Sequence, residues 1–133
     1  MKPRSGASVL LFGLTAGQEK LVRTAGLKWG LRCRTVPQEH YNRTLLQLVS
    51  GKQAEVPAYS GPVPQTAALL LAGVPSSVLQ PFLQQLRKAG LPTSVLKAVL
   101  TEQNSSWTAV ALLEELAQEH AALAAGSTPV HRA

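Results

Sequence analysis

Two short turns in this sequence combine small residues with a hydroxyl group, a pattern that suits the binding of an anion. Gly13 is followed by Thr15, and Gly73 is followed by Ser76; each turn stands between an apolar run and a helical pattern. Backbone N–H groups at the start of a helix can bind negative charge. Neither turn has the residue spacing of a P-loop or of a dinucleotide-binding loop. The alternative is that these residues only form tight turns from strand to helix.

Asn104 and Trp107 form a second candidate pair, in the segment LKAVLTEQNSSWT at residues 96–108. An aromatic ring and an amide three residues apart can line a ligand cleft. In the alternative interpretation Asn104 bonds the backbone of its own turn, and Trp107 packs over the start of the last helix. The candidate ligand-binding residues are Gly13, Thr15, Gly73, Ser76, Asn104 and Trp107.

The sequence offers little material for catalysis or for a metal site. It contains no Asp, the commonest member of carboxylate metal sites and of Ser-His-Asp triads, and its three histidines are far apart. The single Cys33 excludes an internal disulfide. Its neighbours Arg32 and Arg34 would lower its pKa, but strand alternation turns the thiol away from both, towards the core. We therefore predict no catalytic residue, cofactor or metal; the alternative is a small enzyme that uses His40, Cys33 or Thr15.

A regular alternation of strand and helix patterns positions these residues. The runs SVLLFGL (8–14) and AALLLAGV (67–74) are continuous and apolar, as in strands that are buried on both faces. The segments 31–36 and 95–100 have a mixed character, as in strands that are half exposed. A helical period follows each strand, so the expected order is βαβα followed by βαβα.

Residues that start and stop helices indicate where these helices lie. The first helix is expected to start at Thr15, whose spacing to Gln18 is that of a capping box. A second helix is expected from about 38 to 49, ending before Gly51. The expected caps of the third and fourth helices are Ser76 or Ser77 and Ser105 or Ser106.

The two halves of the chain share this plan. A shift of sixty residues places Gly13 on Gly73, and a slightly larger shift places Thr44 on Thr108. At 133 residues the chain is expected to form a single domain. Its parts are the pseudo-repeat halves 8–51 and 66–124, a Pro/Gly-rich linker loop 52–65 and a frayed tail 125–133.

We predict an α/β fold of three compact layers, in which helices cover both faces of a four-stranded, mainly parallel sheet. The flavodoxin-like strand order 2-1-3-4 is favoured because it places the two most apolar strands in the centre. A ferredoxin-like antiparallel sheet is the alternative. In the parallel order the turns at Gly13 and Gly73 would meet between the first and third strands, where such sheets bind ligands. The joint at Asn104 would lie at the same edge.

Positive charge is concentrated in the first part of the chain. Residues 1–52 hold nine Lys and Arg against two Glu, a net charge of +7, whereas residues 53–133 hold four against five, a net charge of −1. This imbalance indicates an anionic partner or only a solubilising surface. We expect a non-enzymatic binding or regulatory module for an anionic small molecule or a protein; nucleic-acid binding is the alternative, although no RRM-type motif is present. Because no apolar run is long enough to span a bilayer, a cytoplasmic location without membrane association is expected.

One segment resembles a known family. The residues KAVLT at 97–101, Asn104, Trp107 and LLEE at 112–115 are similar to the C-terminal signature of a small bacterial domain-of-unknown-function family. The Gly13 turn and AGV at 72–74 fit the layout of that family, so the resemblance extends over about 9–123. The family has no established activity, cofactor or catalytic residue. The resemblance therefore implies a compact bacterial domain and transfers no function.

Overall fold

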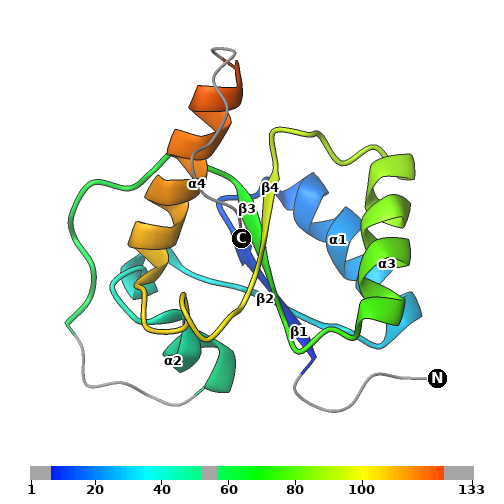
Figure 1. Cartoon of the computed structure of the whole chain (residues 1–133), viewed down its shortest axis with the longest axis horizontal. Coiled ribbons are helices and arrows are strands. Elements are labelled where there is room, and N and C mark those ends of the chain that lie inside the picture. Colours follow the sequence, from blue (N-terminus) through cyan, green and yellow to red (C-terminus); the bar gives the residue numbers. More distant parts are fainter. Residues whose placement is uncertain (1–6, 52–56, 125–133) are drawn as a thin grey trace.

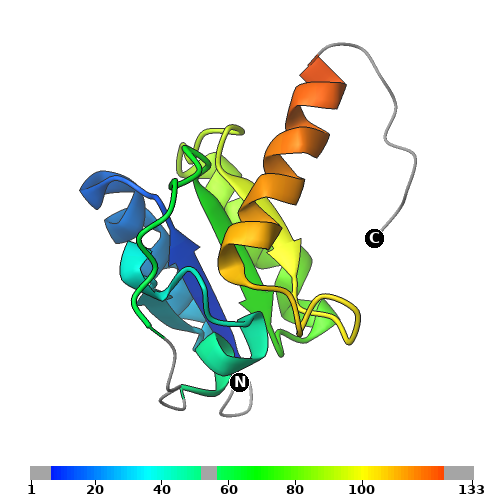
Figure 2. The same cartoon turned by 90° about the vertical axis from the view of Figure 1, so that its left-hand side faces the viewer.

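The computed structural model describes residues 7–51 and 57–124, which form one sheet with helices on both of its faces (Figures 1 and 2). The strands are β1 (Ser8–Phe12), β2 (Arg32–Thr35), β3 (Ala68–Ala72) and β4 (Leu96–Val99). The helices are α1 (Ala16–Trp29), α2 (Leu45–Ser50), α3 (Ser76–Lys88) and α4 (Ala109–Ala124), and a short 3₁₀ turn, η1, spans Gln38–His40.

The strand order is β2-β1-β3-β4, as predicted, but the sheet is mixed. β1 is parallel to β2 and β3 is parallel to β4, whereas the central strands β1 and β3 are antiparallel, with Leu10 opposite Leu70. The flavodoxin-like prediction is therefore correct in strand order and wrong in the direction of β3 and β4. The ferredoxin-like alternative, an antiparallel sheet, does not fit the two parallel pairs.

The short second helix accounts for this difference. A helix over 38–49 would run back along the sheet, but α2 starts only after its cap Thr44 and has six residues, a length of about 9 Å. Before β3, Tyr59 lies beside η1, because its N–H donates to the Glu39 carbonyl oxygen at 2.8 Å. β3 therefore starts at the end of the sheet where β1 ends, beside Phe12, and it runs antiparallel to β1.

Each face of the sheet has its own core. Val9 and Leu11 of β1 pack with residues of α1 and α3, among them Phe82. Leu10 and Phe12 pack on the other face with residues of α2 and α4. These four β1 side chains are at most 1% exposed, which confirms the predicted burial of the strand on both faces. Each such side chain contributes about 1.5–3 kcal/mol of transfer free energy on burial.

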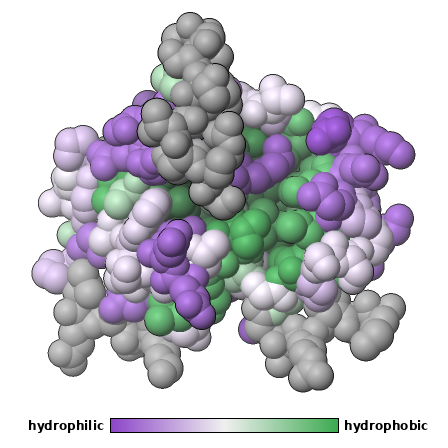
Figure 3. Space-filling model, viewed as in Figure 1, coloured by the Kyte–Doolittle hydropathy of each residue, from purple (hydrophilic) through white to green (hydrophobic). Residues whose placement is uncertain are grey.

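β4 is an edge strand that is partly open to solvent. Figure 3 shows hydrophobic residues gathered near the centre of the view, where Figure 1 places β4. Val99 of this strand is 47% exposed, and Lys97, two residues before it, is exposed as well. A lysine on an edge strand discourages the addition of a further strand.

Several contacts join residues at corresponding positions of the two halves. Leu10 and Leu70, which the shift of sixty equates, lie opposite each other in the central strand pair. Thr44 and Thr108, which a shift of 64 equates, form an isolated antiparallel bridge between the starts of α2 and α4. Residues that are equivalent in the two halves therefore contact each other.

Reciprocal hydrogen bonds surround this bridge. The Leu45 N–H donates to the Trp107 carbonyl oxygen at 2.8 Å, and the Ala109 N–H donates to the Arg43 carbonyl oxygen at 3.0 Å. The shift of 64 exchanges these two bonds. The starts of α2 and α4 are thus joined backbone to backbone.

Helix starts follow the predictions only in part. The capping box of Thr15 and Gln18 is present at α1. Pro75 precedes α3, and no side chain caps that helix, so neither Ser76 nor Ser77 has the predicted role.

α4 also starts later than predicted. Its first turn is capped by Thr108, whose Oγ1 accepts a hydrogen bond from the Ala111 N–H at 3.2 Å. Neither Ser105 nor Ser106 is the cap, because the residues before Thr108 are held in the hydrogen bonds to the start of α2.

The predicted linker loop and tail are described only in part. Residues 57–65 have no helix or strand, while 52–56 and the tail 125–133 lie outside the described residues. Among the helices of the described residues, none has the length and apolar character that crossing a membrane requires.

Candidate functional site

The antiparallel pairing of β1 and β3 separates the two glycine turns. Gly13 follows the end of β1 and Gly73 follows the end of β3, so these turns lie at opposite ends of the sheet. The predicted crevice between them does not form, because it requires two strands that end at the same edge. Thr15 is engaged in its capping box, and Ser76 is exposed at the start of α3.

Asn104 is held by its own turn. Its Oδ1 accepts a hydrogen bond from the Thr101 N–H at 2.8 Å, and its Nδ2 donates to the Val99 carbonyl oxygen at 3.0 Å. Trp107 is 38% exposed, and its backbone is bonded to Leu45. Neither Asn104 nor Trp107 lines the pocket between β2 and α2 or the pocket between α3 and β4. The structure therefore does not bring the predicted ligand-binding residues together.

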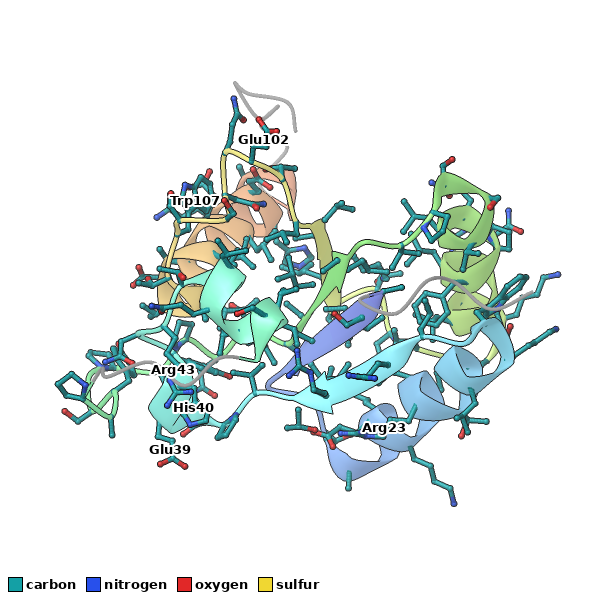
Figure 4. The ribbon with its side chains drawn as sticks, turned by 90° about the horizontal axis from the view of Figure 1, so that it is seen from below. Arg23, Glu39, His40, Arg43, Glu102 and Trp107 are labelled. Atoms are coloured by element: carbon teal, nitrogen blue, oxygen red, sulfur yellow. The ribbon has the colours of Figure 1, made fainter. Side chains whose placement is uncertain are left out.

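The pocket between the end of β2 and α2 has a volume of about 350 Å³. Small-molecule sites have volumes of about 300–1,000 Å³. Arg34, His40 and Arg43 line this pocket, and no Asp or Glu of the described residues does. Figure 4 shows His40 and Arg43 close together before α2, with Glu39 pointing away. We call this the β2–α2 pocket.

The β2–α2 pocket exists because α2 ends early. α2 stops at Ser50, and Gly51 then adopts a left-handed conformation with φ 72°. The equivalent helix α4 has 16 residues, and the shift of 64 places Gly51 on Glu115, well inside α4. Figure 2 views the face that carries both helices. The longer helix continues past this position, whereas among the described residues the shorter one ends beside the end of β2.

Arg34 is partly buried and is fixed by the end of α2. Its Nη2 donates to the carbonyl oxygens of Leu48 and Val49 at 2.9 and 3.0 Å. Positive charge is favourable at the C-terminus of a helix. The Nε of Arg34 is buried and has no hydrogen-bond partner among the described residues. An unpaired buried donor of this kind costs about 1–3 kcal/mol.

His40 and Arg43 are half-buried, and hydrogen bonds hold their backbone. The Arg43 N–H donates to the His40 carbonyl oxygen at 3.0 Å, and the Arg43 carbonyl oxygen accepts the bond from Ala109 of α4. With Arg34, these residues bring basic side chains from β2, η1 and the turn before α2 to one place. The arrangement can recognise an anionic group by charge and by directed hydrogen bonds.

Comparison with known proteins concerns the second half of the chain, from the start of β3 into α4. Residues 67–123 match a domain of unknown function (DUF3783). The DUF3783 match supports the resemblance that the C-terminal segment shows and leaves the first half of the chain outside it. No curated protein and no solved structure matches the chain.

The β2–α2 pocket lies outside the DUF3783 segment, since its lining residues fall between Leu10 and Gly51. The shift of 64 finds no basic residue at the equivalent positions in the DUF3783 segment. It places Arg34, His40 and Arg43 on Ala98, Asn104 and Trp107. The basic lining is therefore a property of the first half and not a requirement of the fold.

The sequence pattern marks His40 as a candidate and does not distinguish Arg34 or Arg43 from the other basic residues. Both arginines are unremarkable within a basic half, and nothing local marks them as neighbours in space. The signal that could have found them is the comparison of the two halves at the shift of 64, at which each basic residue meets a neutral one.

Cys33 points into the core, as predicted. Its Sγ lies 3.9 Å from the Val22 carbonyl oxygen and packs against Gly26 of α1. Burial raises the pKa of the thiol above its ordinary value of 9.0, and the charge of Arg23 offsets this only in part. Within 7–51 and 57–124, no group of three or more His, Cys, Asp or Glu side chains is placed to hold a metal ion.

Cys33 is expected to react slowly in the folded protein. At pH 8, iodoacetamide should modify Cys33 in the folded protein at no more than about a tenth of the rate in protein unfolded with guanidinium. The reason is that the thiolate is the reactive form and burial disfavours the thiolate. Because the pKa of Cys33 is higher in the folded state than in the unfolded state, the protonated thiol makes its full contribution to stability below pH 9.0. This contribution is lost as the pH rises through the pKa of the folded state. Equal rates in the two states would contradict this placement.

Proposed function

We propose that the protein is a non-enzymatic binding module that holds a small organic anion in the β2–α2 pocket. The observation that carries this proposal is the lining, in which Arg34, His40 and Arg43 meet with no carboxylate among the described residues. Hydrogen bonds between charged groups are worth about 1.5–3 kcal/mol each, and arginine suits carboxylate and phosphate groups in particular.

The lining favours an anion with an apolar part. Leu10, Val36 and Leu48 line the pocket together with the basic residues. Its volume of about 350 Å³ is more than an inorganic ion fills. A carboxylate or phosphate group would bind at His40 and Arg43, and the apolar part of the ligand would lie against the aliphatic side chains.

A regulatory role is part of this proposal, because Arg43 links the pocket to the second half of the chain. Its backbone is bonded to Ala109 at the start of α4. A ligand that contacts the Arg43 side chain would stabilise the folded form, and with it the contact between Arg43 and α4, because the ligand binds only the folded form.

Other functions and the cytoplasmic location stay predictions. Nucleic-acid binding by the basic first half would show a steep dependence of affinity on salt, and a shallow dependence would contradict it. The small enzyme that uses His40, Cys33 or Thr15 is less well supported, because the burial of Cys33 disfavours its reactive thiolate.

The substitution Arg43→Gln tests the proposed function. We expect it to weaken the binding of phenyl phosphate or benzoate about tenfold, which is the effect of losing one charge-assisted hydrogen bond. Isothermal titration calorimetry gives the affinity, and amide chemical shifts locate the ligand.

Arg32→Gln is the matched control. It removes the same charge from the first residue of β2, which is exposed and does not line the pocket. Its affinity should stay within about twofold of the wild type, because an exposed charge that does not line the pocket is screened by water and salt. The proposal would be wrong if the wild type bound neither probe, or if both variants lost the same affinity.

A further inference from the structure

A second group of basic side chains, Arg87 and Lys97, lies on the opposite face of the sheet, inside the DUF3783 segment. A pocket of about 80 Å³ between α3 and β4 is lined by Arg87 and Lys97, with Gln80 and Thr93 as neutral polar neighbours. Within 7–51 and 57–124, no Asp or Glu lines either this pocket or the β2–α2 pocket. We call it the α3–β4 pocket.

Lys97 occupies a strand position that faces the helices. The register places it beside Leu69, which belongs to the core between the sheet and the layer of α1 and α3. In the first half the equivalent residue is Cys33, which lies beside Val9 and packs into the same core. A lysine at this position keeps a further strand from adding to the edge, but that role does not require a second cation.

The second cation is Arg87, in the last turn of α3. Although Lys97 and Arg87 are both largely exposed, partial burial of the Lys97 ammonium group lowers its pKa, and the charge of Arg87 lowers it further. The Lys97 Nζ donates to the Val95 carbonyl oxygen at 3.1 Å, which holds it at this end of β4. Two like charges held at one pocket repel each other unless an anion lies between them.

The size of the α3–β4 pocket limits what can bind. Since a water molecule takes up about 30 Å³ in the liquid, 80 Å³ leaves room for a small ion and little else. The hydroxyl of Thr93 and the amide of Gln80 can donate hydrogen bonds to oxygen atoms. These properties match a compact oxyanion.

We propose that the α3–β4 pocket binds free inorganic phosphate between Arg87 and Lys97. This site is separate from the β2–α2 pocket in position, size and ligand, and it does not depend on the proposed function. Phosphate relieves the repulsion of the two cations and accepts hydrogen bonds from both.

The test compares the wild type with Lys97→Gln and with the control Lys88→Gln. Lys88 is exposed on α3 and does not line the pocket, so both variants lose one charge from the same region. At constant ionic strength, phosphate should shift the amide resonances of Thr93 and Lys97 in the wild type and in Lys88→Gln. We expect Lys97→Gln to bind phosphate about tenfold more weakly.

Thermal unfolding provides a second readout. Phosphate should raise the Tm of the wild type and of Lys88→Gln, and this rise should be lost in Lys97→Gln. Without phosphate, Lys97→Gln should be at least as stable as the wild type, since the repulsion with Arg87 is removed. The inference is overturned if phosphate raises the Tm of all three proteins equally. It is also overturned, while the proposed function stands, if phosphate shifts only resonances of the β2–α2 pocket.

Discussion

Replacing Leu86 with Ala is expected to lower the free energy of unfolding by about 2–5 kcal/mol. Leu86 of α3 is 0% exposed and lies in the core between the sheet and the layer of α1 and α3. The substitution removes buried methyl groups and leaves a cavity that the surrounding side chains fill only in part. Since small domains have stabilities of about 5–15 kcal/mol, this loss would be a large share of the total. Denaturation with urea, followed by circular dichroism, measures it.

Leu27→Ala is the matched control for Leu86→Ala. Leu27 lies on α1, in the same layer of helices, but its side chain is 80% exposed. The same chemical change should therefore alter the stability by no more than about 0.5 kcal/mol. Losses of similar size in the two variants would contradict the assignment of the buried and exposed faces of these helices.

Replacing Gly13 with Ala is expected to destabilise the protein by about 1–3 kcal/mol. Gly13 has a φ of +69°, and a Cβ atom added there would lie 3.0 Å from the Thr66 carbonyl oxygen. The left-handed backbone disfavours any side chain, and the oxygen belongs to a backbone that cannot easily move aside. The requirement for glycine therefore follows from the turn itself. This supports the alternative that Gly13 only forms a tight turn.

Gly17→Ala should change the stability of the protein in the opposite direction. Gly17 lies in the first turn of α1, and an added Cβ would meet no atom within 4 Å. Alanine favours the helix by about 0.5–1 kcal/mol, so this variant should be more stable than the wild type. If both variants were destabilised alike, the cost at Gly13 would not come from its backbone conformation. Chemical denaturation of the two variants and the wild type under the same conditions measures both changes in the free energy of unfolding.

Local patterns predicted most of the elements. The continuous runs at β1 and β3 identified strands that are buried on both faces, because only such strands can be apolar at every position. Thr15 and Gln18 predicted the start of α1, because a capping box needs only residues within one turn. The start of α4 was predicted too early, because the chain before Thr108 bonds to the start of α2, far away in the sequence.

The candidate site was harder to predict. Gly13 and Gly73 were expected at one edge, and the structure places them at opposite ends of the sheet. Asn104 was correctly recognised as a residue that could close its own turn, since that requires only Thr101 and Val99 nearby. The β2–α2 pocket depends on the early end of α2, which local patterns did not predict.

The sequence by itself determined which strands are central, which residues are buried, and that the first half carries the positive charge. These properties depend on single side chains and on their local spacing. Only the tertiary structure decided the direction of the second half and the meeting of Arg34, His40 and Arg43. Parallel and antiparallel pairings of β1 and β3 satisfy the same backbone groups and bury the same faces, so the apolar pattern does not distinguish them. The choice goes with the short α2 and with the contact of Tyr59 with Glu39, and it also decides where a ligand can bind.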